Sequence, residues 1–106
     1  AAYRRMARKG ARIWREHGAL EYRECVGDDL AVKAAAAFGI ATFPRSLKLK
    51  RGETAVFAWV MFKSRAHRDR VNAKVMNDPR LAKMPTPMPF DFKRMVYGGF
   101  EILVAA

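Results

Sequence analysis

The segment "TAVFAWVMF" (residues 54–62) constrains the fold most strongly, because it is apolar on both faces of an extended chain. A strand with alternating polar and apolar residues can leave one face in water, whereas a strand of this kind needs cover on both faces. The segment therefore predicts a central, doubly covered strand. Residues 50–53, with Gly52 among charged neighbours, predict the turn that leads into it.

A helix and a strand are predicted before this segment. Apolar residues recur at three- and four-residue steps through residues 3–17, with arginines between them, which is typical of an amphipathic helix. Gly18 follows as the residue that most easily turns left-handed past a helix end. Residues 19–26 then predict a strand that Gly27 and two aspartates close.

A second helix is predicted after the central strand. Ser64 is a good N-cap, and the helix should reach about Asn77 with Val71 and Val75 on its inner side. Three prolines in residues 85–89 then enforce a loop.

Residues 95–104 predict the last strand, and residues 30–46 predict an irregular connection. The order helix, strand, strand, helix, strand is that of a ferredoxin-like βαββαβ sandwich whose first strand is absent, in one α+β domain over residues 1–106. The first strand of such a sheet is interior and the last strand pairs with it. We therefore expect that residues before Ala1, or another chain, supply that strand.

Three segments of the chain resemble the YbaA-like family, a group of small bacterial proteins of unknown function. They are "HGALEYRECVGDD", "SRAHRDRVNAKVMNDPR" and "MPFDFKRMVYGGFE". The similarity extends from Tyr3 to Val104, with an interruption at residues 31–43. The resemblance implies a ferredoxin-like fold that pairs as a homodimeric α+β barrel, with an N-terminal strand ahead of the first helix. It brings no established catalytic residues.

In a dimeric barrel each sheet turns one face toward its partner, and the enclosed cleft is where related folds bind small ligands. Alternation along the strands assigns Val56, Ala58, Val60, Val96, Phe100 and Ile102 to the helices. It leaves Phe57, Trp59, Met61, Met95, Tyr97 and Glu101 for the cleft. If Leu20, Tyr22 and Glu24 point the same way, the cleft is aromatic with one or two carboxylates, as suits a small metabolite.

Glu24 and His67 are the candidates for acid–base chemistry. A carboxylate among apolar neighbours either meets an arginine or has its pKa raised, and a raised pKa suits a general acid or base. The structural alternatives are a Glu–Arg pair or a residue near solvent for Glu24, and a partly exposed side chain near a helix terminus for His67. His17, at the end of the first helix, has the same structural explanation.

Asp91, Lys93 and Arg94 follow the proline-rich segment. Polar loop residues serve function more often than core residues do, and in that interpretation Asp91 and Arg94 cover the cleft. In the structural interpretation Asp91 caps a turn, and the basic pair is solvated.

The formal net charge is +11, from 21 basic and 10 acidic residues, which permits attraction to nucleic acid or to other anionic surfaces. A solvated basic surface explains the same charge. RNA-recognition domains share the βαββαβ order, and "VYGGFEIL" echoes their glycine-aromatic motif, but it lies on the last strand instead of the third.

The sequence predicts no metal site and no cofactor, because Cys25 is the single cysteine and no Cys/His cluster exists. No apolar run is long enough to span a membrane, and no signal peptide is recognisable, so we expect a soluble, cytoplasmic protein. Three functions remain open: a metabolite-binding homodimer, a nucleic-acid-associated protein, and an interaction module without a ligand. No set of residues with a catalytic arrangement is identifiable. Cofactor-independent oxygenation occurs on the same broad fold, and it is suggested here by that analogy alone.

Overall fold

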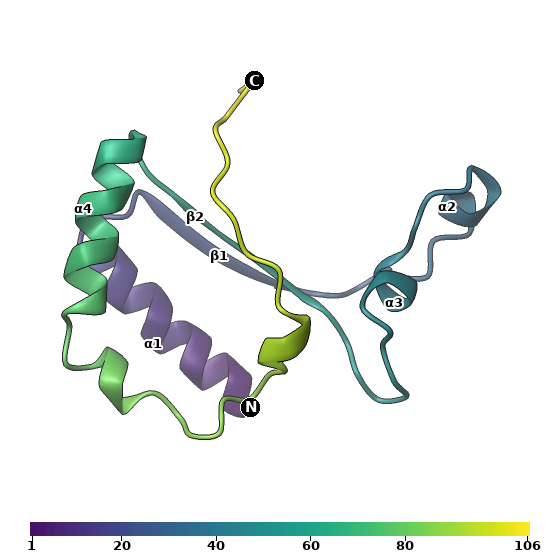
Figure 1. The fold of residues 1–106 in the computed structure, drawn as a ribbon, viewed down its shortest axis with the longest axis horizontal. Coiled ribbons are helices and arrows are strands. Elements are labelled where there is room, and N and C mark those ends of the chain that lie inside the picture. The colour runs from purple at the N-terminus through teal and green to yellow at the C-terminus, as the bar shows by residue number, and fades with distance from the viewer.

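The computed structural model describes residues 1–106, apart from the side chain of Ala36, and has a mixed α+β architecture (Figure 1). The elements in chain order are α1 (Ala2–Glu16), β1 (Glu21–Val26), α2 (Lys33–Ala37), α3 (Phe43–Ser46), β2 (Val56–Met61) and α4 (Arg65–Met76), followed by the 3-10 helices η1 (Leu81–Lys83) and η2 (Phe92–Arg94). None of the described helices combines the length and the apolar character that crossing a membrane requires.

Local signals placed α1 and β1 correctly. Gly18 has a φ of 114°, a left-handed conformation that a residue with a Cβ rarely adopts. The amide of Ala19 then donates to the carbonyl of Trp14 at 3.0 Å, which closes the end of the helix. The chain reverses there and enters β1.

Strands β1 and β2 form a two-stranded antiparallel sheet, with Tyr22 opposite Val60 and Glu24 opposite Ala58. The predicted N-cap of α4 is confirmed, because the Ser64 hydroxyl accepts from the amide of His67 at 3.1 Å. Helices α1 and α4 lie next to each other on one side of the sheet (Figure 1).

The buried core lies where α1, α4 and the start of β1 meet. Its fully enclosed members are Ile13, Ala19, Val71 and Val75, and Trp14, Val60, Phe62, Leu81 and Met84 pack around them. The predicted inner positions of α4 are confirmed. Burying one side chain of this kind stabilises the fold by about 1.5–3 kcal/mol.

The prediction of a doubly covered strand is wrong for most of β2, because four of its six residues are exposed. Val56 and Ala58, which were assigned to the helices, are among the exposed residues. The helices cover Val60, whereas Phe57 and Trp59 on the opposite face remain 60% and 37% exposed. The sheet formed by residues 1–106 has two strands, and the expectation of a strand from outside these residues stays a prediction.

The connection between the strands differs from the irregular segment expected. It contains two short helices, α2 and α3, and projects away from α1 and α4 as an arm (Figure 1). The alanines of residues 33–37 satisfy their helix propensity, and Pro44 lies in the first turn of α3, where its missing amide costs nothing. The arm exposes Phe38 and Ile40.

The prediction of a last strand at residues 95–104 is wrong, because residues 95–106 run as an extended chain that forms no strand (Figure 1). The prediction that Val96, Phe100 and Ile102 contact the helices is wrong, because all three are exposed. A strand is held in register by the hydrogen-bonded ladder of its neighbour, and this segment has none.

Replacing Ile13 by alanine is expected to lower the free energy of unfolding by about 2–5 kcal/mol, because the cavity opens inside a small core. Ile40 on the arm provides a matched control, since its side chain is 61% exposed. Ile40→Ala should change the free energy by less than about 0.5 kcal/mol in the same urea denaturation experiment. Equal losses in the two variants would contradict the assignment of the core.

Candidate functional site

The two faces of the sheet carry different chemistry. Directly opposed residues of an antiparallel pair share a face, so Tyr22 and Glu24 lie with Val60 and Ala58. That face is turned toward the helices, because the ring of Tyr22 packs against Trp14 with centroids 5.9 Å apart.

The expectation that Tyr22 and Glu24 line the cleft together with Phe57, Trp59 and Met61 is therefore wrong. The alternation within each strand was assigned correctly, but the face of β1 was not. The sequence analysis assumed the face of β1, and the hydroxyl of Tyr3, which binds Glu24 on the helix side, is 21 residues away in sequence.

Glu24 binds two tyrosine hydroxyls and no arginine. Tyr3, in the first turn of α1, donates to its Oε1, and Tyr22 donates to its Oε2 at 2.7 Å. Burial raises the pKa of both phenols, and the hydrogen bonds to the Glu24 carboxylate raise the pKa further. The cluster is tightly packed, since a Cβ at Gly10 would lie 3.3 Å from the Tyr22 hydroxyl. It fastens β1 to α1.

His67 completes the cap of α4. Its Nδ1 accepts from the amide of Lys63 at 2.9 Å, while its own amide donates to Ser64. The arrangement resembles a capping box, but the ring of His67 accepts from the amide before the N-cap and not from that of Ser64 itself. Its ring also lies near Phe62, with centroids 6.0 Å apart. Among the contacts of the described residues none joins His67 to Glu24, so the structure does not bring the two acid–base candidates together.

His17 belongs to an ionic network that sequence reasoning missed. Its Nε2 lies 2.7 Å from the carboxylate of Asp78, and Arg80 joins that carboxylate to Glu16 at the end of α1. The side chain of Asp78 is only 7% exposed, and hydrogen bonds from Arg80 and then His17 hold its pKa well below the usual value. The sequence signal was the segment "DPR", which places an arginine two residues after the aspartate. The network holds the turn after α4 against α1.

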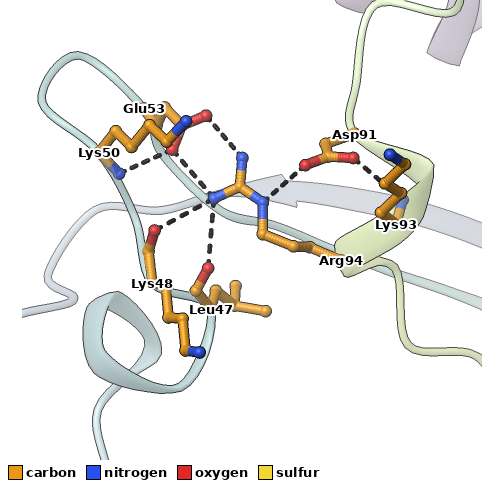
Figure 2. Close-up of polar contacts among 7 residues, drawn as sticks. All are labelled: Leu47, Lys48, Lys50, Glu53, Asp91, Lys93 and Arg94. Carbon is orange, nitrogen blue, oxygen red and sulfur yellow. Dashed lines mark hydrogen bonds and ion pairs between the residues drawn. The ribbon is translucent and has the colours of Figure 1, made fainter.

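Arg94 links the η2 segment to the loop of residues 47–53 by hydrogen bonds (Figure 2). Its guanidinium donates to the backbone carbonyls of Leu47 and Lys48 at 3.2 and 3.3 Å, to Glu53 at 2.6 and 2.9 Å, and to Asp91 at 2.7 Å. The hydrogen bonds from Arg94 lower the pKa of Glu53 to about 2 and also lower the pKa of Asp91.

The hydrogen bonds of Asp91 and Arg94 are with residues 47–53 and within η2, and none of them involves Phe57, Trp59 or Met61. The expectation that the two residues cover the cleft stays a prediction. Asp91 does cap a turn, as the structural interpretation required, by accepting from the amide of Lys93 at 3.0 Å. Arg94 is not simply solvated, because its guanidinium donates to both carboxylates and to two backbone carbonyls.

The outer face of the sheet is open and largely apolar. It carries Phe57 opposite Cys25, Trp59 opposite Arg23, and Met61 opposite Glu21. Tyr97 was expected to join this surface, but it is 83% exposed in the unpaired segment 95–106. Within the described residues, no three His, Cys, Asp or Glu side chains gather to hold a metal ion. The candidate site is this face, with Phe57, Trp59 and Met61 as its apolar members.

Replacing Glu24 by glutamine is expected to lower the pKa of Tyr3 and Tyr22 toward 10.0, the ordinary value, because it removes the negative charge that opposes ionisation of both phenols. A raised pKa in the folded state contributes stability that is complete below the unfolded value and is lost as the pH rises through the folded value. Wild type should therefore lose stability above about pH 10, and Glu24→Gln should lose less.

The measurements are the ultraviolet absorbance of tyrosinate and thermal unfolding, both against pH. Glu21→Gln is the matched control, because Glu21 lies on the opposite face of the same strand, paired with Arg23 at 2.7 Å. A control that shifts the tyrosine titration as far as Glu24→Gln would refute the specific link.

Comparison with known proteins agrees with the motifs of the sequence. A family model described as "Protein of unknown function (DUF1428)" matches residues 1–92. The uncharacterized protein YbaA of Escherichia coli K12 is 41% identical over 103 residues, which make up 97% of this chain and 84% of the relative. YbaA from Escherichia coli O157:H7 and from Shigella flexneri matches to the same extent. The resemblance is thereby confirmed, and the chain belongs to the DUF1428 family of bacterial proteins of unknown function.

Proposed function

We propose that this protein is a homodimeric binding protein for a small apolar or aromatic metabolite. In this proposal the open faces of two sheets turn toward each other, each chain forming half of a ferredoxin-like dimeric α+β barrel. The ligand lies between them against Phe57, Trp59 and Met61.

The observation that carries the proposal is the contrast between the two faces of β1 and β2. On the helix side Val60 packs against the core although Val56 stays 39% exposed, whereas Phe57 and Trp59 on the outer face stay 60% and 37% exposed with no core beside them. Contiguous apolar surface of this kind marks a site of interaction. Burying one large apolar side chain in an interface stabilises the assembly by about 1.5–3 kcal/mol. Contact with a partner is therefore favoured over contact with water at this face.

A second copy of the chain suits this face for two reasons. A two-fold dimer presents the same patch on both subunits, so each open face is covered by its equivalent. The extended residues 95–106 also carry unpaired backbone groups and exposed apolar side chains, Phe100 and Leu103 among them. Such a segment is a template for strand pairing. The family resemblance implies the same pairing.

The ligand class follows from the side chains at the face. Aromatic rings and a thioether favour flat, polarisable, apolar molecules. Arg23 and Glu21, which form an ion pair at 2.7 Å, lie directly opposite Trp59 and Met61 and offer polar groups at the edge of that surface. A pocket that is mainly apolar with a few polar groups is typical of metabolite sites.

Trp59→Glu is expected to convert a dimer into a monomer, because the new carboxylate would have to be buried without a partner in the interface. The measurement is the mass in solution by size-exclusion chromatography with light scattering. Met76→Glu is the control, because Met76 is also exposed but lies on α4, on the helix side. A wild-type chain that runs as a monomer, or a Trp59→Glu variant that stays dimeric, would contradict the pairing.

Ligand binding is tested by the fluorescence of Trp59. Trp14→Phe leaves Trp59 as the one tryptophan of the two in the chain. Indole and 1-naphthol should change its emission saturably, and Phe57→Ala should weaken binding by about tenfold, the equivalent of losing one aromatic contact. Phe38→Ala, on the exposed arm, should have no effect. A dimer whose Trp59 responds to no such probe would favour the interaction module without a ligand.

A further inference from the structure

Helix α1 carries a row of arginines along its outer side: Arg4, Arg5, Arg8, Arg12 and Arg15, here called the arginine stripe. All five are exposed. At 3.6 residues per turn they fall within an arc of about 100°. Ile13 and Gly10 point the other way and are buried against the rest of the protein.

No carboxylate neutralises the stripe among the described residues. The one acidic residue of α1, Glu16, is paired with Arg80, and Glu21 is paired with Arg23. Arg15 donates to the backbone carbonyls of Ala19 and Leu20, which leaves its charge in place. The positive charge of this surface is therefore uncompensated within the fold.

The positive charges of the arginine stripe destabilise helix α1 itself. Arg4 and Arg8, and Arg8 and Arg12, are like charges four residues apart, which repel. Arg4 and Arg5 also lie toward the positive end of the helix dipole, and the first turn contains no acidic residue. Glutamine would fill these exposed positions with similar helix propensity. A bound polyanion removes both penalties.

A shallow hollow between α1 and β1 borders the C-terminal end of the stripe. Arg12 and Arg15 line it from α1, and Leu20, Glu21, Tyr22 and Arg23 line it from the other side. Glu21 and Arg23 form an ion pair at 2.7 Å and lie opposite Met61 and Trp59, so their side of the hollow adds no net charge. The excess positive charge here therefore comes from the stripe on α1 alone.

We propose that the arginine stripe binds the phosphate backbone of a nucleic-acid duplex without reading its sequence. From Arg4 to Arg15 the helix rises about 16 Å, a length over which one strand of a duplex carries about five phosphates. The planar fork of arginine matches phosphate oxygens two at a time. No aromatic side chain belongs to the stripe, so bases have nothing to stack on.

A membrane is the less suitable anionic partner. Helices that lie on lipid insert an apolar face, whereas the apolar face of α1 is already buried against β1 and α4. The stripe also lies on the outer side of the helix layer, away from Phe57 and Trp59. Nucleic-acid binding and the proposed dimer therefore use different surfaces, and either can fail without the other.

The test is fluorescence anisotropy with a labelled, mixed-sequence DNA duplex longer than the stripe, at about 50–200 mM salt. Five phosphate contacts predict a slope of log Kobs against log salt of about −4.5. Arg8→Gln/Arg12→Gln should bring the slope to about −2.7, because two contacts are lost. Arg8→Lys/Arg12→Lys should keep the slope and weaken the affinity, because the charge stays and the fork is lost.

The matched control removes the same charge from α4, as Arg70→Gln/Lys74→Gln, at two exposed positions. It should keep the wild-type slope. Circular dichroism should show the same helix content in all variants. A control that loses as much slope as Arg8→Gln/Arg12→Gln, or no binding at low salt, would overturn the proposal. So would stronger binding to phosphatidylserine vesicles than to the duplex.

Discussion

The contact of Ile13 on α1 with Val71 and Val75 on α4 is the packing on which the rest of the structure depends. It joins the two long helices into a layer on one side of β1 and β2. The fully buried core is small, so polar contacts at its margins add to it. The Glu24 cluster fastens one end of α1 to β1, and the network of Asp78 and Arg80 fastens the other end to the turn after α4. A small domain buries little surface and is only marginally stable, so each such link contributes a large share of its stability.

This packing gives the molecule two unlike outer surfaces. Beyond the helices lies the arginine stripe, polar and positively charged; beyond the sheet lies the apolar face of Phe57 and Trp59. Neither surface contributes to the core, so neither is explained by folding alone. A partner that excludes water would stabilise the apolar face of Phe57 and Trp59. A partner with negative charge would stabilise the arginine stripe. The two proposals made for these surfaces are independent for that reason.

Prediction from sequence succeeded where the signal is local. The period of α1, the left-handed Gly18 and the Ser64 cap each depend on residues within one turn, and each is confirmed. Prediction failed for residues 95–106, because the order of a strand depends on a neighbour and not on its own residues. It also failed for Arg94, whose partners lie 41 and 46 residues away in sequence.

The amino-acid sequence by itself determined the places of α1, β1, β2 and α4, which residues alternate together along β1 and β2, the excess of positive charge and the family. These properties follow from periodicity, composition and short motifs. Only the tertiary structure decided which face of β1 meets the helices. That choice depends on Tyr3, a residue 21 positions from Glu24, because its hydroxyl and that of Tyr22 satisfy the carboxylate in place of the arginine that was one of the alternatives. Long-range donors of this kind leave no local pattern, so the place of Glu24 could be found only from the folded chain.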